Sequence, residues 1–390
     1  MPHFFLKLIT FMVCLFISLP LHADMKKAES ALEAKNYEEA FKEFKVEAEQ
    51  GNLQAQYNLA VLYYQGQGIM QDYAKAAEWF RKAADQGDAE AQHNLAVLYD
   101  NGKGLPQDYA KAAEWYQKAA DQGEALAQYK LALLYYKGQG IMQDYAKAAE
   151  WSQKAAVQGN ALAQRLLARL YIEGQGLPQN YAKAAEWYQK AADQGDAYSQ
   201  FKLGFAYKDG QGVTQDYVKA VEWSQKAADQ GHALAQGLLA GLYIEGQGVP
   251  QNYAKAAEWF QKAADQGDAF AQLYLGMLYY KGLGIPQDYV KAAEWFQKAA
   301  VQGDAYAQIY LGILYYKGLG IPQDYVKAAE WFQKAAVQGE ALAQLYLSAL
   351  YDKGQGVPQD SAKAAEWYQK AEDQGLVTEI EESLKGDNKK

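Results

Sequence analysis

The sequence predicts an all-α fold, a solenoid in which antiparallel helix pairs stack along the chain. The first observation is a strict repeat: the nine tryptophans stand at 79, 115, 151, 187, 223, 259, 295, 331 and 367, so that each gap is 36 residues. The second is continuity, because the units that they mark run from Gly51 to Gln374 without insertion or deletion. A single short helix pair cannot bury its apolar face alone, so units of this kind stack and share a continuous core.

Each unit is predicted to hold two helices, as the unit that begins at Gly87 illustrates. Residues 88–100 are expected to form the first helix, residues 101–107 a glycine-rich loop, and residues 108–121 the second helix. Asp108 begins the second helix, and Asp or Asn holds this place in all nine units. This residue type accepts hydrogen bonds from the first free amides of a helix. The prolines of the repeats all lie in the loops, where they remove no helical hydrogen bond.

The second helix has one apolar face with the spacing i, i+3, i+4 and i+7. In the same unit this face consists of small and aromatic residues, namely Tyr109, Ala112, Ala113, Tyr116, Ala119 and Ala120. The alanines predict a close approach of neighbouring helices. Trp115 flanks the face, and the use of Trp at this position in nine units favours packing over ligand stacking. Glu114 and Lys118 are spaced i, i+4, which predicts a solvated ion pair in every unit.

Residues 1–23 are interpreted as a signal peptide. The run from Leu8 to Leu21 is apolar and uncharged, follows Lys7 and precedes a small residue, Ala23. About 20 residues are needed to span a bilayer, and this run is shorter. We therefore expect an exported protein, periplasmic or secreted. The alternative is an uncleaved anchor, with membrane contact through this segment only. Cleavage after Ala23 would remove Cys14, the single cysteine, and with it any disulfide.

The two ends of the array are interpreted as caps. Residues 24–50 are predicted to be a partial repeat, because Tyr37 stands 36 residues before Tyr73 and is therefore in phase with the units that follow. Residues 375–390 are predicted to form a short capping helix and a tail, because Leu376, Ile380 and Leu384 are four residues apart. Between these caps lie the nine repeats, residues 51–374. Terminal units of a solenoid need a polar outer side.

Composition and motifs argue against several functions. The formal net charge is −9 and the chain has no basic cluster, which excludes nucleic acid as an expected partner. His93 and His232, the histidines that would remain after cleavage, lie almost four units apart without a metal-ligand pattern. No Gly-x-Ser-x-Gly motif is present, and the Gly-x-Gly loops lack the third glycine of a phosphate-binding loop. We therefore predict no catalytic residues, no metal and no cofactor.

The stretch AFAQLYLGMLYYKGLGIPQDYVKAAEWFQKAA, from Ala269 to Ala300, resembles the Sel1-like repeat, a relative of the tetratricopeptide repeat. The likeness extends over residues 51–374. It implies a right-handed superhelix of antiparallel helix pairs and a role as adaptor or scaffold between proteins, often in exported bacterial proteins and sometimes in host interaction and virulence. A weak β-lactam-hydrolysing activity has been attributed to a cysteine-rich branch of the family. This chain departs from that branch, because it would have no cysteine after cleavage.

The first helix contains one arc of residues that differs between units. Counted from the first glycine of a unit, positions 3, 5, 6, 9, 10, 12 and 13 hardly change, whereas positions 4, 7, 8, 11, 14 and 15 change freely. In such solenoids the first helices line the concave side, so we expect the changing arc to face the groove. On this arc the sixth unit has few side chains, because Gly237 and Gly241 stand there, and the second unit has polar residues. The last three units are aromatic and apolar, and they supply the candidate partner-binding residues Phe270, Tyr274, Met277, Tyr280, Tyr306, Tyr310, Ile313, Tyr316, Leu342 and Tyr346.

Two readings of this arc stay open. Large aromatic residues favour interfaces, and exposed apolar grooves mark binding sites. The same side chains could instead pack as core against the neighbouring unit. The predicted function is a non-enzymatic exported scaffold that binds a protein or peptide partner in the concave groove, in the cell envelope or in contact with a host cell. The alternative is a hydrolase of β-lactams or cell-wall material, which the cysteine-rich branch suggests but for which the sequence offers no nucleophile and base.

Overall fold

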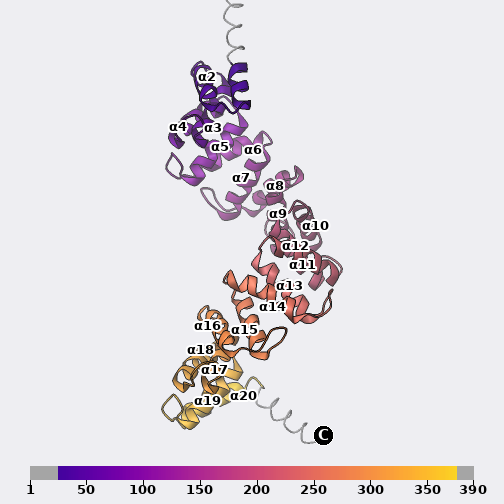
Figure 1. The fold of residues 1–390 in the computed structure, drawn as a ribbon. Helices are drawn as coiled ribbons and strands as arrows, with labels where there is room; N and C mark the ends of the chain where they lie inside the picture. The colour runs from indigo at the N-terminus through magenta and orange to yellow at the C-terminus, as the bar shows by residue number, and fades with distance from the viewer. Residues whose placement is uncertain (1–24, 376–390) are drawn as a thin grey trace, which may run out of the picture. The chain divides into compact units, whose positions relative to one another are not determined.

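The computed structural model describes residues 25–375, and every regular element in that range is helical (Figure 1). The predicted α-solenoid of helix pairs is thereby confirmed. The predicted signal peptide and the closing helix predicted after Gly375 lie outside the described residues. Within the described part, no helix is both long enough and apolar enough to cross a bilayer.

The chain divides into two compact units between Gln194 and Gly195, called here the N-unit and the C-unit. The N-unit contains a helix over residues 25–33 and then α2 (Tyr37–Glu49), α3 (Leu53–Gln65), α4 (Tyr73–Asp85), α5 (Ala89–Asn101), α6 (Tyr109–Asp121), α7 (Ala125–Lys137), α8 (Tyr145–Val157), α9 (Ala161–Glu173) and α10 (Tyr181–Asp193). The C-unit contains α11 (Ala197–Asp209), α12 (Tyr217–Asp229), α13 (Ala233–Glu245), α14 (Tyr253–Asp265), α15 (Ala269–Lys281), α16 (Tyr289–Val301), α17 (Ala305–Lys317), α18 (Tyr325–Val337), α19 (Ala341–Lys353) and α20 (Ser361–Glu372).

Each repeat contributes a first helix, called the A helix, and a second, called the B helix. Helix α3 is the A helix of repeat 1 and α4 is its B helix, and the alternation continues to α19 and α20 in repeat 9. Within each unit an A helix packs on its own B helix, and that B helix packs on the next A helix. Equivalent positions of successive repeats therefore have equivalent neighbours, so a residue type that recurs at one position has the same packing environment each time.

The helix ends are fixed by the residues that the sequence indicated. The Asp108 carboxylate accepts a hydrogen bond from the Lys111 amide at 3.0 Å, and the Asp88 carboxylate accepts one from the Ala91 amide at 2.6 Å. Helix α5 ends at Gly102, whose φ of 66° is in the left-handed region that glycine adopts without strain. The two aspartate caps therefore satisfy amides that the helix itself leaves free, and the Gly102 amide donates to the carbonyl oxygen of Leu98.

The second glycine of each loop has a further role that the sequence analysis did not foresee. A Cβ atom on Gly104 would lie 2.3 Å from the carbonyl carbon of Tyr73 and 2.5 Å from the amide nitrogen of Ala74. These atoms belong to the start of the B helix in the preceding repeat. The Gly-x-Gly loop therefore allows backbone contact between successive repeats as well as a turn within one repeat.

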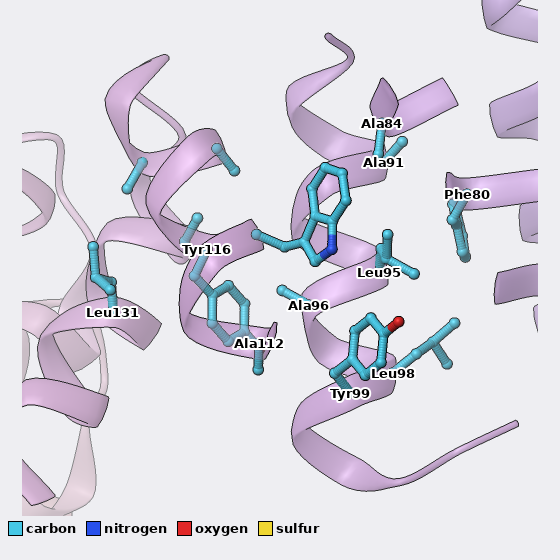
Figure 2. Packing of buried hydrophobic residues seen from close by; sticks show 14 of the residues in the cluster. Phe80, Ala84, Ala91, Leu95, Ala96, Leu98, Tyr99, Ala112, Tyr116 and Leu131 are labelled. Atoms are coloured by element: carbon cyan, nitrogen blue, oxygen red, sulfur yellow. The ribbon is translucent and has the colours of Figure 1, made fainter. Parts of the chain in front are cut away.

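The core repeats the small and aromatic face predicted for the B helix. In α6 the residues Ala112, Ala113, Tyr116, Ala119 and Ala120 are all buried. Figure 2 shows Tyr116 and Ala112 of α6 beside leucine and alanine residues of α5. The alanines leave room for the backbones to approach, and in α6 the Tyr116 ring fills the space beside α5. In α8 and α12 the equivalent residues are the buried Ser152 and Ser224.

Glutamine side chains join the repeats in a ladder. Gln92 on α5 donates to the carbonyl oxygen of Ala84 at 3.1 Å and accepts from Gln122 at 2.8 Å. Gln122 also donates to the carbonyl oxygen of Gly87 at 2.9 Å. Gln92 is 5% exposed, so this bonding prevents a buried amide from remaining unsatisfied. The glutamines at the positions of Gln92 and Gln122, which are present in all nine repeats, are therefore structural.

The tryptophans pack as predicted, but the lysine beside them differs from the prediction. The Lys118 ammonium lies 3.7 Å from the centre of the Trp115 ring, and the equivalent distance in the nine repeats is between 3.6 and 4.1 Å. Among the described residues, the predicted i, i+4 ion pair forms in two repeats, Glu150–Lys154 at 2.9 Å and Glu366–Lys370 at 2.7 Å. The prediction of an ion pair in every repeat was wrong. The indole face holds the cation in all nine repeats, but it does not exclude the ion pair, since Lys154 and Lys370 make both contacts.

Candidate functional site

The changing arc of the last three repeats forms a mixed surface on the A helices of the C-unit. The candidate residues on α15, α17 and α19 are called the α15–α19 face: Phe270, Tyr274, Met277, Tyr280, Tyr306, Tyr310, Ile313, Tyr316, Leu342 and Tyr346. Phe270, Tyr306 and Leu342 are 51%, 57% and 40% exposed. Ile313 is 8% exposed and belongs to the core, so it offers little surface to a partner. The remaining members are half-buried.

Tyrosines at the eighth position of a repeat lie partly in the core. Each stacks on the aromatic ring of the preceding B helix: Tyr274 on Phe260 at 5.3 Å, Tyr310 on Phe296 at 5.0 Å, and Tyr346 on Phe332 at 4.6 Å between ring centres. The rings are nearly parallel, with interplanar angles of 18°, 11° and 3°. One face of each ring therefore packs on the core, as the second reading expected, while the side chain stays half-buried.

Further ring contacts fix the tyrosines relative to one another. Tyr280 meets Tyr310 edge to face at 5.7 Å, and Tyr316 meets Tyr346 in the same manner at 5.9 Å. Burial raises the pKa of Tyr280, Tyr310 and Tyr346 further above the ordinary value of 10.0. Their hydroxyl groups are protonated at neutral pH and can donate hydrogen bonds. The surface is thus a set of oriented rings that carry polar ends.

A pocket of about 270 Å³ adjoins this face on the A helices α11, α13 and α15. Its walls come from α11 and α13, from the B helix α14, and from the start of α15. The residues that line it are Phe201, Phe205, Lys208, Leu234, Gly237, Leu238, Gly241, Ile244, Glu245, Phe260, Asp268, Phe270 and Tyr274. Two residues of the predicted set, Phe270 and Tyr274, therefore also border a pocket that the prediction did not include.

The sequence contained a signal for this pocket. Gly237 and Gly241 fall at positions 7 and 11 of repeat 6, where repeats 7 and 8 have bulky residues. These glycines predict a thinly covered helix, whereas the predicted site comprises only the aromatic residues of the last three repeats. The contribution of Phe201 and Phe205 could not be found in this way, because their meeting with α13 depends on how successive A helices stack.

The A-helix face of the N-unit has a different chemistry. Nδ1 of His93 lies 3.3 Å from a carboxylate oxygen of Glu124, and the Asp100 carboxylate lies 3.7 Å from the Lys130 ammonium. The buried Tyr116 hydroxyl donates to Asp100 at 3.5 Å. Burial opposes ionisation of Glu124, but His93 and the first amides of α7 outweigh it and lower the pKa of this carboxyl group.

These polar groups stabilise the stack and do not form a metal centre. No cluster of three or more His, Cys, Asp or Glu side chains that could hold a metal ion occurs among residues 25–375. His93 is mostly buried and lies against the Tyr116 ring, with 5.6 Å between ring centres. His232 accepts a hydrogen bond from the Ala235 amide at 3.3 Å and so acts as the N-cap of α13. Both histidines that the sequence singled out thus have local structural contacts.

The helix pair that recurs along the chain matches the Sel1 repeat in nine consecutive segments, residues 53–88, 89–124, 125–160, 161–196, 197–232, 233–268, 269–304, 305–340 and 341–376. The chain belongs to the Sel1-repeat family. The resemblance identified in the sequence is thereby confirmed. Proteins built from Sel1 repeats generally serve as scaffolds for protein–protein interaction and not as catalysts.

Two solved structures of Sel1-repeat proteins resemble this one over most of its length. The antigen c5321, which displays the same repeat fold, is described as a protective antigen present in uropathogenic Escherichia coli strains. It shares 37% identity with a TM-score of 0.71 and covers 87% of this chain and 80% of its own. A Sel1 repeat protein from Oxalobacter formigenes shares 34% identity with a TM-score of 0.62 over 79% of this chain and 89% of its own. Comparison with the curated proteins gave no match.

Proposed function

We propose that this Sel1-repeat protein is an exported, non-catalytic scaffold that binds a protein or peptide partner on the α15–α19 face. The observation that carries the proposal is the arrangement of its rings. Tyr274, Tyr310 and Tyr346 are held from one side by core aromatics, while Phe270 and Tyr306 are about half exposed. Aromatic residues are enriched at interfaces, and rings held in place before binding lose little entropy when a partner docks.

The location of the surface on the A helices supports the same function. Solenoids of helix pairs present extended concave binding surfaces along such helices. The B helices, by contrast, carry the same lysine–tryptophan contact in every repeat, so they offer a uniform surface with little information for recognising one partner. Specific recognition requires features that differ along the stack, and these lie on the A helices.

The proposed setting is the cell envelope or the surface of a host cell. The apolar, uncharged run from Leu8 to Leu21 supports export. The related c5321 is described as a protective antigen present in uropathogenic Escherichia coli strains, and this description supports a setting in contact with a host. Cell fractionation with N-terminal sequencing of the mature chain tests this part. We expect a periplasmic or released protein that begins at Asp24, and a cytoplasmic protein that begins at Met1 would contradict it.

Site-specific photo-crosslinking in the cell of origin tests the binding face. A benzophenone amino acid placed at Phe270 or Tyr306 should capture a discrete partner. The same amino acid at Val290 or Val326 on the B helices serves as the matched control, because these positions are 52% and 55% exposed. Equal capture from both sets of positions would overturn the proposed face.

A variant that lacks exposed side chains of the binding face and an assay for hydrolysis complete the test. With the benzophenone amino acid kept at Tyr306, the double substitution Phe270→Ser and Leu342→Ser should abolish capture and leave the unfolding temperature nearly unchanged, because both side chains are exposed. Turnover of the chromogenic β-lactam nitrocefin in proportion to purified protein would contradict a purely non-catalytic scaffold and support the hydrolase alternative.

A further inference from the structure

The pocket on α13 exists because two glycines stand in the middle of a helix. Gly237 and Gly241 lie one turn apart on the A-helix face of α13. At the same two positions α15 has Leu273 and Met277, and α17 has Ile309 and Ile313. The missing side chains leave a hollow in a surface that its neighbours fill.

The packing of the described C-unit does not require these glycines. A Cβ atom on Gly241 would meet nothing within 4 Å, and on Gly237 the nearest atom would be Cδ1 of Phe270 at 3.9 Å. Gly276 and Gly312 are different, because a Cβ atom there would lie 2.7 Å from the rings of Phe296 and Phe332. Glycine inside a helix destabilises it by about 1 kcal/mol relative to alanine. Gly237 and Gly241 thus weaken α13 without relieving a clash inside the protein.

The hollow is walled by rings that stay accessible. Phe205 and Phe270 are 43% and 51% exposed, while the better buried Phe201 and Phe260 line the pocket from α11 and α14. A volume of about 270 Å³ between such walls suits one large apolar side chain and part of its backbone. The same walls would bury that side chain on several sides, as the anchor pockets of protein interfaces do.

Charge at the rim indicates which residue stands beside the anchor. Lys208 is half-buried at the pocket, and among the described residues no ion pair involves it. A second cation of α11, the Lys202 ammonium, lies 5.5 Å from the centre of the Phe201 ring. Of the acids at the pocket, Asp268 already caps α15 through the Ala271 amide at 2.7 Å, and Glu245 is exposed and solvated. The α11 side of the rim therefore favours a carboxylate.

We propose that this pocket, the α13 pocket, receives a large apolar side chain of a partner peptide and that an acidic side chain next to it pairs with Lys208. The inference rests on the proposed function. It specifies the side chains of that part of the partner that binds beside the α15 end of the α15–α19 face. The acid is a side chain within the peptide, because a single ammonium suits one carboxylate, whereas a chain terminus is captured by several backbone amides. Phe270 and Tyr274 belong to both surfaces, so the peptide continues from the pocket onto the face.

Capped model peptides and the full chain test the pocket directly. The probe is acetyl-Gly-Glu-Phe-Glu-Gly-amide, and saturation-transfer NMR titration measures its dissociation constant. Burial of an aromatic side chain implies that the matched probe with Ala in place of Phe binds at least about tenfold more weakly. The probe with Lys in place of both Glu residues should bind about three- to tenfold more weakly, as the loss and reversal of a surface ion pair imply.

Two substitutions separate the pocket from general stability. Gly241→Leu fills the hollow and should weaken the Glu-Phe-Glu probe at least about tenfold. Its unfolding temperature should be equal or higher, since the fold accepts Leu133 at this position of α7 and helices favour leucine over glycine. Lys208→Glu should reverse the preference between the acidic and basic probes. Lys317→Glu, which makes the same change at an exposed lysine of α17, should leave this preference unchanged.

The outcomes distinguish this inference from the proposed function. An absence of binding by the Glu-Phe-Glu probe, or binding that Gly241→Leu leaves unchanged, overturns the α13 pocket as an anchor site. Capture through Tyr306, which does not line the pocket, can then still support the face. Probe binding that depends on Gly241 and Lys208, together with no capture through Tyr306, supports the pocket and overturns the proposed face. Weaker probe binding in Gly241→Leu, with an unfolding temperature equal to or above the parent's, is the result expected.

Discussion

The A-helix faces of the two units differ in chemistry although they are built on the same scaffold. In the N-unit, α5 and the start of α7 present polar pairs such as Asp100–Lys130 and His93–Glu124. In the C-unit, α15, α17 and α19 present stacked tyrosines. The glutamine ladder and the lysine–tryptophan contact are the same in both units. The scaffold therefore leaves one surface free to vary, and the two units use it differently.

The aromatic character of the C-unit face depends on the ring beneath it, so removal of that ring should have the largest effect. Phe296 is fully buried and stacks on Tyr310. Phe296→Ala should lower the free energy of unfolding by about 3–5 kcal/mol, the usual cost of deleting a buried aromatic side chain. Chemical denaturation followed by circular dichroism measures it.

The same variant shows whether the two faces are independent. Hydrogen exchange should increase in α15–α18 and remain unchanged in α5–α7, because a repeat contacts its neighbours. If Phe296→Ala lowered the protection of backbone amides equally in both units, the two faces would be coupled and could not be treated as independent surfaces.

The second prediction separates the core role of a tyrosine from its surface role. Tyr310→Ala should lower the free energy of unfolding by about 1–3 kcal/mol, because one ring face is stacked and the side chain is half-buried. Tyr306→Ala, one turn away and largely exposed, should change it by less than about 0.5 kcal/mol. Similar losses for both variants would mean that the exposed ring also belongs to the core.

The regular part of the fold was predictable because each repeated residue has one environment. The 36-residue period, the Asp108 cap and the alanine face of α6 were read from local pattern, and the helices begin and end where these signals stand. The ion pair of Glu114 and Lys118 was mispredicted, since i, i+4 spacing identifies neighbours on a helix but does not show that Lys118 also reaches the Trp115 ring.

The candidate site was predictable only in part, because it depends on contacts between repeats. The changing arc located Phe270, Tyr274 and Tyr306 on one surface. It could not show that Ile313 is buried or that Tyr274 stacks on Phe260 of the preceding B helix. A glycine in a sequence does not show whether neighbouring side chains fill the space beside it, so Gly241 alone did not predict a pocket.

The third prediction compares two glutamates at the same place in the repeat. Glu124 accepts hydrogen bonds from the amides of Leu126 and Ala127 at the start of α7, whereas Glu340 makes no such bond at the start of α19. At pH 7, Glu124→Ala should lower the free energy of unfolding by about 1 kcal/mol, the usual value of an N-cap, and Glu340→Ala by a few tenths at most, about 0.3 kcal/mol.

The pH dependence identifies the cause of that difference. Folding lowers the pKa of Glu124 below its ordinary value of 4.5, so its contribution is complete above this pH and is lost as the pH falls further. Thermal unfolding of the parent and both variants between pH 7 and pH 3 measures the effect. A gap between the parent and Glu124→Ala that stays constant down to pH 3 would exclude the ionised carboxylate as its source.

The smallest predicted effect concerns His232, which caps the helix that carries the α13 pocket. Nδ1 of His232 accepts from the Ala235 amide, so the cap requires the neutral ring. Burial lowers the pKa of His232 below its ordinary value of 6.5; nearby Asp196 opposes this shift and Lys202 adds to it. Between the two pKa values the unfolded chain binds a proton that the folded chain does not, so the free energy of unfolding should fall as the pH drops below about 6.5.

An asparagine at this position removes the titration and keeps the cap, as Asn160 does for α9. His232→Asn should therefore match the parent at pH 7.5 and exceed it at pH 5 by less than about 1 kcal/mol, within the range of an N-cap. Thermal unfolding at the two pH values measures this difference. His93→Asn serves as the comparison in the N-unit, because His93 lies beside the Glu124 carboxylate and caps no helix. An equal gain at pH 5 in both variants would show that acid weakens the two units in the same way, and the special dependence of α13 on a neutral histidine would be disproved.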